Sequence, residues 1–493
     1  MRLILCVALA LAFPPAIHGQ ATNAPPVPVD HWSRAALARL AGAGGADAGR
    51  ALWAWPLSRE EVRVLFEAAA ETPAKPGGRI ASDALRRLEA EFPEASPQAV
   101  VASFQIGTGW TGEDGGLRGG TSFLENIDGS SYGGPVAVPY RGNQLTRLRA
   151  ESAYGRWGAS AEMRRSGEDH SLHEFSVSAA VGPVDVWAGR RGMAVGSASD
   201  GSIVLSPGVR FDGGGISVPQ GFHLGPLGQV RGTFTLARLE RSGSVVNPYF
   251  SAARLTLTPR PWFTIGLNRA ALFGGEGNPE AVTPWNVVLV MAGVTSYLGK
   301  SSGFENQVAS FDLWMRHEVG NVPVALYGEW GFDDISFALV NAPAFVLGVE
   351  LPEFPLLPSA GVGLEHVRFA GSCCGHPAWY RHRRLAEGWT DRGTTLGHPL
   401  GGHGTEWALR IALLEHRGSL NLSGRFFTRN RGIENLFSPD REGRSWGALV
   451  RGGWRVGAFE LGGTVGAEEG AAGWDTWSAE AGINWWMTTG PAS

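Results

Sequence analysis

The chain has 493 residues, of which 43% are hydrophobic and only 18% are charged. The charged share lies below the roughly 25% of an average soluble protein. The formal net charge of -4 gives no overall positive field, so we expect no nucleic-acid partner. The 71 glycines argue against a mainly helical protein, because a glycine inside a helix costs about 1 kcal/mol relative to alanine. The apolar content argues against a disordered chain.

The first 21 residues have the pattern of a cleaved export signal. Arg2 supplies a positive start, residues 3–13 form a short apolar run, and Gly19 and Ala21 offer a small-residue cleavage site. The alternative is an N-terminal membrane anchor, but the run is shorter than the roughly 20 residues that cross a bilayer. The sequence predicts a signal peptide at 1–21 and an exported mature chain.

Residues 22–97 are predicted to form a small helical domain. Apolar side chains recur at helical spacing in three segments, 33–40, 62–66 and 85–92. Ser58 and Glu61 have the spacing of a capping box, in which each side chain accepts a hydrogen bond from the backbone N–H of the other. Each predicted helix has one apolar side, so we expect that side to pack against other structure.

From residue 98 onward the apolar residues recur with a period of two, which is the period of a β-strand. Leu255 and Leu257 alternate with polar residues, the Pro-containing segment 259–261 predicts a turn, and the alternation resumes over 263–267. The same device recurs along the chain in runs of about ten residues, a length typical of membrane-spanning strands.

The alternating runs are joined by tight turns at one end and by long glycine-rich connections, such as 192–215 and 370–404, at the other. This arrangement is typical of outer-membrane barrels, so we predict a transmembrane β-barrel over 98–493. Dividing its length by about 22 residues for each strand with its connection gives roughly 18 antiparallel strands. The alternatives are a soluble sandwich, whose strands average about five to six residues, and a propeller, which would show a repeat of about 40–50 residues.

The 19 tryptophans fit a barrel, because indole rings gather at both interfaces of a membrane. Those near predicted strand ends are Trp262, Trp407, Trp446, Trp454, Trp477 and Trp485. We expect these side chains to contact outer-membrane lipid at the level of its headgroups. Packing inside a sandwich, the alternative, would place tryptophan in mid-strand more often.

Four blocks of sequence, in order, resemble the Wzi-type capsule-assembly outer-membrane proteins. They are Val246 to Gly277 with its Gly-Gly-Glu-Gly motif, Glu305 to Arg316, Ala325 to Asp334 and Arg392 to Gly404. The resemblance implies a barrel above a periplasmic helical bundle. It also implies a protein that attaches or organises capsular or exported polysaccharide at the cell surface by binding rather than by reaction.

The helical region carries a second similarity. Residues 30–45 followed by 56–69 resemble a surface-layer-homology unit. That likeness implies peptidoglycan as a further partner, and it keeps open the alternative of a diffusion porin with a cell-wall-tethering helical base. A porin would conduct steadily in a planar bilayer, whereas a plugged anchor would not.

Strand alternation predicts which polar side chains face the barrel lumen. Arg254, Asp312, Arg316, Tyr327 and Glu329 all fall on the lumenal side. Arginine on the lipid side would cost about 2–4 kcal/mol at the membrane midplane, so lumenal charges are expected. The favoured interpretation is a salt-bridge network that stabilises the barrel. The alternative is a polar track that contacts sugar hydroxyls, which makes these five residues candidate ligand-binding positions.

Three further candidates lie at strand ends or in connections. Glu276 stands between two glycines, where it either bonds the loop or faces a ligand, and the first is favoured. Asp334 and Arg392 belong to the blocks that carry the resemblance. Arg269 falls on the lipid side of its strand, so it must lie beyond the apolar band or follow a bulge.

The sequence predicts no enzyme, no cofactor and no metal centre. It contains neither a G-x-S-x-G elbow in a helical context nor an H-E-x-x-H motif. Cys373 and Cys374 lie near several histidines but lack the paired spacing of zinc ligands. In an exported protein, adjacent cysteines are better interpreted as a vicinal disulfide in a loop.

Overall fold

The structure is a computed structural model of the chain. It describes residues 27, 31–52, 54–71, 78–91, 100–114, 143–154, 156–166, 169–198, 201–206, 209–242, 245–278, 282–292, 305–333, 344–369, 379–380, 388–391, 394–429, 443–471, 473 and 475–489. The signal peptide predicted at 1–21 lies outside these residues.

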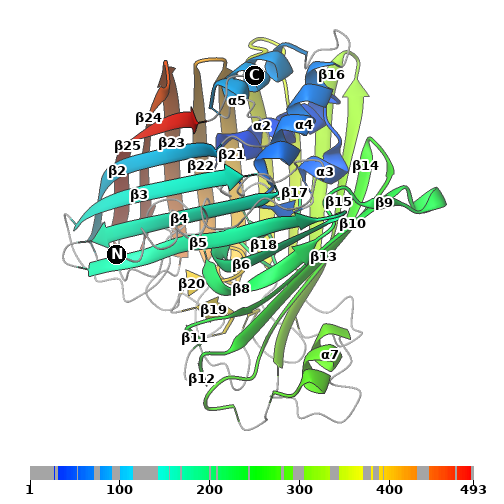
Figure 1. Cartoon of the computed structure of the whole chain (residues 1–493), viewed down its shortest axis with the longest axis vertical. Helices are drawn as coiled ribbons and strands as arrows, with labels where there is room; N and C mark the ends of the chain where they lie inside the picture. Colours follow the sequence, from blue (N-terminus) through cyan, green and yellow to red (C-terminus); the bar gives the residue numbers. More distant parts are fainter. Residues whose placement is uncertain are drawn as a thin grey trace.

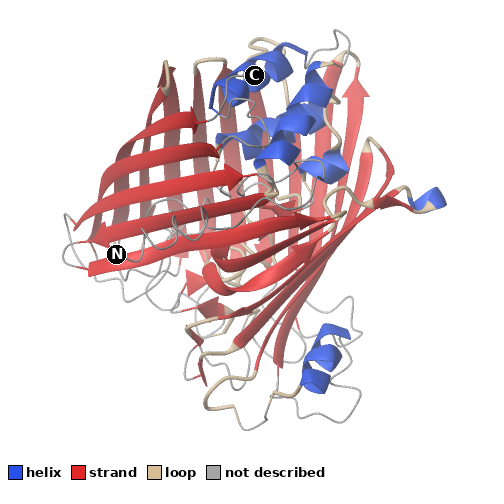
Figure 2. Ribbon diagram, in the orientation of Figure 1, coloured by secondary structure: helices blue, strands red, loops and turns tan. Residues whose placement is uncertain are grey.

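Eighteen antiparallel strands form a closed barrel (Figures 1 and 2). In chain order they are β2 (Val100–Asp114), β3 (Asn143–Tyr154), β4 (Trp157–Ser166), β5 (Asp169–Val181), β6 (Val184–Gly192), β8 (Arg210–Ser217), β10 (Gln229–Arg238), β13 (Tyr249–Arg260), β14 (Phe263–Phe273), β15 (Glu305–Val319), β16 (Val322–Asp333), β17 (Ala344–Leu351), β18 (Ala360–Phe369), β21 (Gly404–Glu415), β22 (Gly418–Arg429), β23 (Gly443–Val456), β24 (Phe459–Gly470) and β25 (Asp475–Thr489). Pairing of β2 with β25 closes the barrel, and the predicted fold and strand number are confirmed.

Seven two-residue strands lie outside the barrel ladder or extend it. They are β1 (Ala54–Trp55), β7 (Ala194–Val195), β9 (Phe222–His223), β11 (Arg241–Ser242), β12 (Val245–Val246), β19 (Thr390–Asp391) and β20 (Thr394–Thr395). The one that matters most below is β7, because it pairs with β1 inside the barrel.

The two ends of the barrel differ, as the sequence predicts. Short turns join strands at one end, at 182–183, 261–262, 320–321, 416–417 and 457–458. Long connections join them at the other end, at 193–209, 274–304 and 370–403. In outer-membrane barrels the short turns face the periplasm and the long loops face the outside. We call these the short-turn end and the outer end.

The outward side chains form an apolar belt. Leu255 and Leu267 on neighbouring strands are 40% and 47% exposed, whereas the alternating Arg254 and Asn268 are buried in the lumen. All six tryptophans expected at the interfaces are exposed to a similar degree, including Trp407. A belt of exposed leucine, valine and tryptophan around a closed barrel is what lipid, and not water, stabilises.

The N-terminal helices fill the short-turn end of the barrel (Figures 1 and 2). They are α2 (Trp32–Ala43), α3 (Ala48–Ala51), α4 (Arg59–Ala70) and α5 (Gly78–Glu91). Among the described residues, two further helical pieces lie in connections between strands: η1 (Gly225–Leu227) and α7 (Pro284–Ala292). The capping box predicted at the start of α4 is present, with Ser58 and Glu61 exchanging both hydrogen bonds. No helix in the described part of the chain is long and apolar enough to cross a membrane.

One predicted connection is wrong in part. Residues 192–215 were expected to be a long loop, but β8 begins at Arg210 and pairs with both β6 and β10. The glycine run 213–215 hides the strand in the sequence, because glycine shows no apolar alternation. Adding a Cβ to Gly213 would place it 2.4 Å from Leu236 O, so this strand needs glycine for its close packing.

Candidate functional site

The predicted lumenal residues meet in a buried network. Arg254 on β13 and Asp312 on β15 form an ion pair whose Nη1 and Oδ2 atoms lie 2.5 Å apart, and both side chains are almost fully buried. Asn268 donates to the same carboxylate at 2.7 Å. Ser197, from the connection between β6 and β8, donates to its other oxygen at 2.7 Å. The carboxylate is therefore held by three different parts of the fold.

Glu329 bonds the same β6–β8 connection a few residues after Ser197. Its Oε1 accepts hydrogen bonds from the hydroxyls of Ser202 and Ser310, both at 2.6 Å, and its Oε2 accepts from the backbone N–H of Ile203. Glu329 is 3% exposed. A carboxylate with this many donors and this little exposure positions the connection inside the lumen.

The other two lumenal candidates also contact protein. Tyr327 donates to Glu365 at 2.8 Å and accepts from Arg410 at 2.6 Å. Arg316 lies against Gly44 at the end of α2, so closely that a Cβ on Gly44 would overlap its guanidinium group. Arg254, Asp312, Tyr327 and Glu329 thus fit the structural interpretation that the sequence favoured, whereas Arg316 packs against the end of α2. Their contact with a saccharide stays a prediction.

A stretch of the β6–β8 connection runs through the barrel interior. We call residues 193–198 and 201–206 the lumenal segment. At one end Ala194 pairs with Trp55, which places β7 against β1 beside the helices. At the other end, Ile203 accepts a hydrogen bond from the Tyr380 hydroxyl at 2.6 Å, and Val204 accepts one from the Trp389 indole at 3.0 Å.

The outer end of the lumen contains packed side chains from these connections. Trp379, Tyr380, Trp389, Leu396 and Leu400 are all 0% exposed. Burial raises the pKa of Tyr380 well above its usual value, so the hydroxyl stays protonated and donates to the lumenal segment. One continuous apolar core runs from the helices, through the lumenal segment, to these residues. These residues therefore fill part of the lumen at its outer end.

The helices are fixed to the barrel wall at four points. Arg59 pairs with Glu151 at 2.7 Å, Arg87 with Glu460 at 2.8 Å, and Asp47 with Arg231 at 2.6 Å. Arg39 donates to three carbonyl oxygens of the wall, those of Pro352, Ser359 and Ala412. The Arg59–Glu151 and Arg87–Glu460 pairs are buried and hold one arrangement strongly, because breaking one leaves an uncompensated charge. The helices form a plug and not a loosely tethered domain.

The remaining sequence candidates divide into two groups. Glu276 is exposed at the outer end, where its backbone bridges Val246 and its carboxylate accepts a bond from Asn247. That placement fits the loop-bonding interpretation. Asp334, Arg392, Cys373 and Cys374 lie outside the described residues, so their ligand contacts and the disulfide stay predictions. Within the described part, no cluster of three histidine, cysteine or acidic side chains is arranged to hold a metal ion.

The structure adds an outer rim that sequence reasoning missed. Arg190, Asp212, Arg238 and Tyr249 are paired in one row across β6, β8, β10 and β13. Arg190 and Asp212 bond twice, at 2.7 and 2.6 Å, and the Arg238 guanidinium lies 5.1 Å from the centre of the Tyr249 ring. The row begins just beyond the exposed Val177 of the apolar belt. Only strand register brings these residues together.

A hollow of about 610 Å³ lies beside this row. It is lined by Leu172, Phe175, Gly189, Arg190, Asp212, Gly213 and Glu240. Carboxylates, a guanidinium group and an aromatic edge surround a glycine floor. This combination supplies acceptors, donors and an apolar surface within one open pocket of ordinary ligand size.

Helix α7 places an aromatic side chain at the same end of the barrel. Thr283 caps the helix by accepting from the N–H of Asn286, and Val290 packs on the outward side of the strands with Ala271 and Phe273. Trp285 is 64% exposed. The sequence carried a signal for it, because Thr-Pro ahead of an apolar run predicts a helix start.

Comparison with known proteins identifies relatives. The family model of the capsule assembly protein Wzi matches residues 118–466 of this chain. Wzi of Escherichia coli is an outer-membrane protein involved in group 1 capsule assembly and a carbohydrate-binding β-barrel. Its structure superposes with a TM-score of 0.70 at 18% identity, covering 94% of this chain and 99% of its own. At that identity the likeness establishes the fold.

Looser likenesses reach two barrels of Pseudomonas aeruginosa. OccK5 (OpdH) and OpdL each superpose with a TM-score of 0.46 at 10% identity over 79% of this chain, covering 98% and 99% of their own. These scores are too low to carry an argument. No curated protein sequence matches the chain.

Proposed function

Because the chain belongs to the Wzi family of capsule assembly proteins, we propose that it binds capsular or exported polysaccharide at the outer membrane. The polysaccharide is held at the outer face of the cell, and the protein catalyses no reaction on it. Outer-membrane lipid surrounds the apolar belt. This function requires an outward-facing binding surface and a barrel that remains in the membrane, and it does not require an open channel.

The protein inside the lumen is the observation that carries the proposal. A plug at the short-turn end and packed connections at the outer end both occupy the lumen within the described residues. The runner-up function, a diffusion porin, needs an open path for solute. A filled barrel is better suited to presenting a surface than to transport.

The outer rim supplies contacts that suit a polysaccharide. Asp212 and Glu240 accept hydrogen bonds from sugar hydroxyls, and Arg190 donates to them. The exposed face of Trp285 offers a flat apolar surface for the C–H face of a sugar ring, at a low cost in side-chain entropy. These residues, with Glu276, Asp334 and Arg392, are the proposed contact positions.

Deleting the gene tests the function in the cell. The expected result is less cell-bound polysaccharide and more in the medium, at unchanged total synthesis. Complementation with Arg190→Ala is expected to restore retention only in part. Complementation with Arg260→Ala is the matched control, because Arg260 is the last residue of β13, at the opposite end of the barrel. Unchanged retention after deletion would contradict the proposal.

Peptidoglycan is a second proposed partner, through the helical plug. The support is the resemblance of 30–45 and 56–69 to a surface-layer-homology unit. Co-sedimentation of the purified protein with peptidoglycan sacculi tests it. Failure to sediment would remove this partner and would leave the polysaccharide proposal unaffected.

A further inference from the structure

Four glycines lie side by side on the inner wall of the barrel. Gly453, Gly462, Gly482 and Gly107 come from β23, β24, β25 and β2, and each pairs with the next in strand register. They face the lumen, because Ile106 and Ile483, their chain neighbours on two of these strands, are exposed on the lipid side. Neighbouring strands are about 4.8 Å apart, so the row spans about 14 Å.

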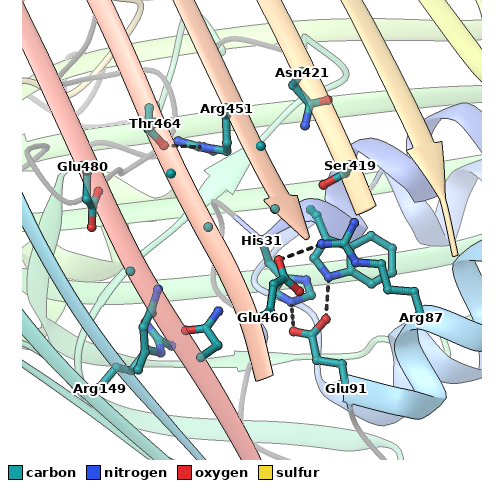
Figure 3. Close-up of a pocket in the computed structure, with 18 residues that line it drawn as sticks. His31, Arg87, Glu91, Arg149, Ser419, Asn421, Arg451, Glu460, Thr464 and Glu480 are labelled. Atoms are coloured by element: carbon teal, nitrogen blue, oxygen red, sulfur yellow. Dashed lines mark hydrogen bonds and ion pairs between the residues drawn. The ribbon is translucent and has the colours of Figure 1, made fainter. Parts of the chain in front are cut away.

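Polar side chains border the glycine row on both sides. One border is formed by Arg451, Thr464 and Glu480, which are paired across β23, β24 and β25. The other border, four residues away along the strands and so about 13 Å distant, is formed by Glu460, Asn484, Gln105 and Arg149. Figure 3 shows Arg451, Thr464 and Glu480 on one side of this trough, and Glu460 and Arg149 on the other.

The plug covers the trough without filling it. His31, Arg87 and Glu91 face it from the plug (Figure 3), and a cavity of about 150 Å³, which Trp32 also lines, lies between them and the wall. A second cavity of about 200 Å³ continues beside Ala35 and Ala38 of α2. His31, Trp32, Asn421 and Arg451 line both cavities. Together the two cavities form one chamber at the short-turn end, which is polar beside the glycine row and largely apolar beside α2.

Glycine inside a strand weakens it, and it usually marks a bulge, a close backbone approach or a place where a ligand comes near. The register of β23, β24 and β25 continues without a shift through the glycine row. A Cβ added at Gly482 would come within 3.1 Å of Ile106 O, and one at Gly453 would overlap the Glu460 carboxylate, so close packing explains these two glycines. A Cβ at Gly462 would meet only Gly452 O, at 3.7 Å. Neither a bulge nor a close approach explains the glycine there, and the open floor at Gly462 leaves room for a ligand.

The chemistry of the borders selects the class of ligand. Each border carries one arginine and one glutamate, so neither a polyanion nor a polycation gains from their charge. The amides of Asn421, Asn484 and Gln105 and the hydroxyl of Thr464 offer donors and acceptors together, which suits the hydroxyl groups of a neutral sugar. Asn484 Oδ1 is buried and accepts no hydrogen bond from the described residues.

The geometry points to a second saccharide site, in which a short neutral oligosaccharide lies along the glycine row beneath the plug. It is distinct from the proposed polysaccharide-binding surface at the outer rim, because it lies at the short-turn end, beside Gly453 and Glu460 on either side of the turn at 457–458. The ligand reaches it from the periplasmic side. A nascent exported polysaccharide and a free periplasmic oligosaccharide both carry the hydroxyl groups that this site would bind.

Calorimetric titration of the full mature chain in detergent micelles tests the site. Maltotriose, cellotriose and chitotriose serve as neutral probes, and at least one is expected to bind in the millimolar range or tighter. Gly462→Leu fills the trough and is expected to weaken that binding at least tenfold. Gly424→Leu is the matched control, because a Cβ at this outward-facing glycine of β22 meets nothing within 4 Å.

Asn484→Ala serves as a second variant if Gly462→Leu does not reach the folded, heat-modifiable state on gels, and it is expected to weaken binding at least threefold. Wild-type protein that binds none of the three probes would overturn the site, as would unchanged binding in the folded variants. Cell-bound polysaccharide measured in the same strains separates the two proposals. Retention of polysaccharide is expected to be normal in the Gly462→Leu strain. A loss of polysaccharide retention would bear on the rim proposal only in protein that still binds the probes.

Discussion

Trp55 in the plug and Ala194 in the β6–β8 connection are backbone partners in a two-stranded sheet inside the barrel. From Ala194 the lumenal segment continues to Ile203 and Val204, which accept hydrogen bonds from Tyr380 and Trp389 at the outer end. One segment therefore contacts both the periplasmic plug and the residues that close the outer end. The two closures support each other, because loss of this segment would leave buried polar groups unpaired at both ends.

Conductance tests the role of the lumenal segment. Wild-type protein in a planar bilayer is expected to show no steady current. Replacing 197–205 by a glycine-serine segment of equal length is expected to produce resolved conductance steps, because the outer closure loses its support. The same replacement over 222–227, in a connection away from the lumen, is the control. Steady wild-type conductance would favour the porin alternative.

The Arg254–Asp312 pair provides a stability prediction. Asp312→Ala leaves a buried guanidinium without its carboxylate, which costs about 3–5 kcal/mol. Asp212→Ala also removes a carboxylate from an arginine, but the Asp212 side chain is 45% exposed, so the expected cost is below about 1 kcal/mol. Urea unfolding of the detergent-solubilised barrel measures both. An equal loss of unfolding free energy in the two variants would show that burial does not determine how much each ion pair contributes to stability.

Glu61 in the plug predicts a pH dependence. Burial raises the pKa of this carboxyl from 4.5 to about 7 in the folded protein. Between these values the unfolded chain releases a proton that the folded chain keeps, so the stabilising contribution is complete below pH 4.5 and is lost as pH rises through 7. The loss is on the order of 3 kcal/mol.

Glu61→Gln tests this directly, since glutamine keeps the cap without the charge. The variant is expected to be more stable than the wild type at pH 8 and close to it at pH 4.5, by urea unfolding of the plug followed through tryptophan fluorescence. Glu67→Gln, on the exposed side of the same helix, is the control. A parallel pH dependence in wild type and Glu61→Gln would assign the effect to another group.

Local sequence patterns predicted the parts of the fold that depend on residues close together in the chain. The alternation around Leu255 and Leu267 predicted strands and their lipid-facing sides, and the Ser58–Glu61 spacing predicted the start of α4 correctly. Arg269, which alternation placed toward lipid, bonds Gln307 on the next strand and lies beyond Leu267 toward the outer end. That outcome matches the first of the two explanations offered for it.

Long-range placement could not be predicted in the same way. The plug was expected as a periplasmic bundle below the barrel, whereas Arg59 and Arg87 bond the inner wall of the barrel, on β3 and β24. Neither partner, Glu151 or Glu460, stands near the helices in sequence. The outer rim depends likewise on register across four strands, which no local pattern of Arg190 or Asp212 reveals.

Trp285 provides the last prediction, for binding at the outer rim. Its ring is largely exposed, so Trp285→Ala is expected to change stability by less than about 0.5 kcal/mol. Loss of an aromatic anchor from a binding surface costs about 2 kcal/mol, which corresponds to roughly 30-fold weaker binding of the purified polysaccharide. Trp285→Phe should retain most of the affinity, and Val288→Ala, at another exposed position of α7, should retain all of it. Equal affinity in Trp285→Ala and wild type would exclude stacking on this helix and would confine the contact to the hollow beside Arg190.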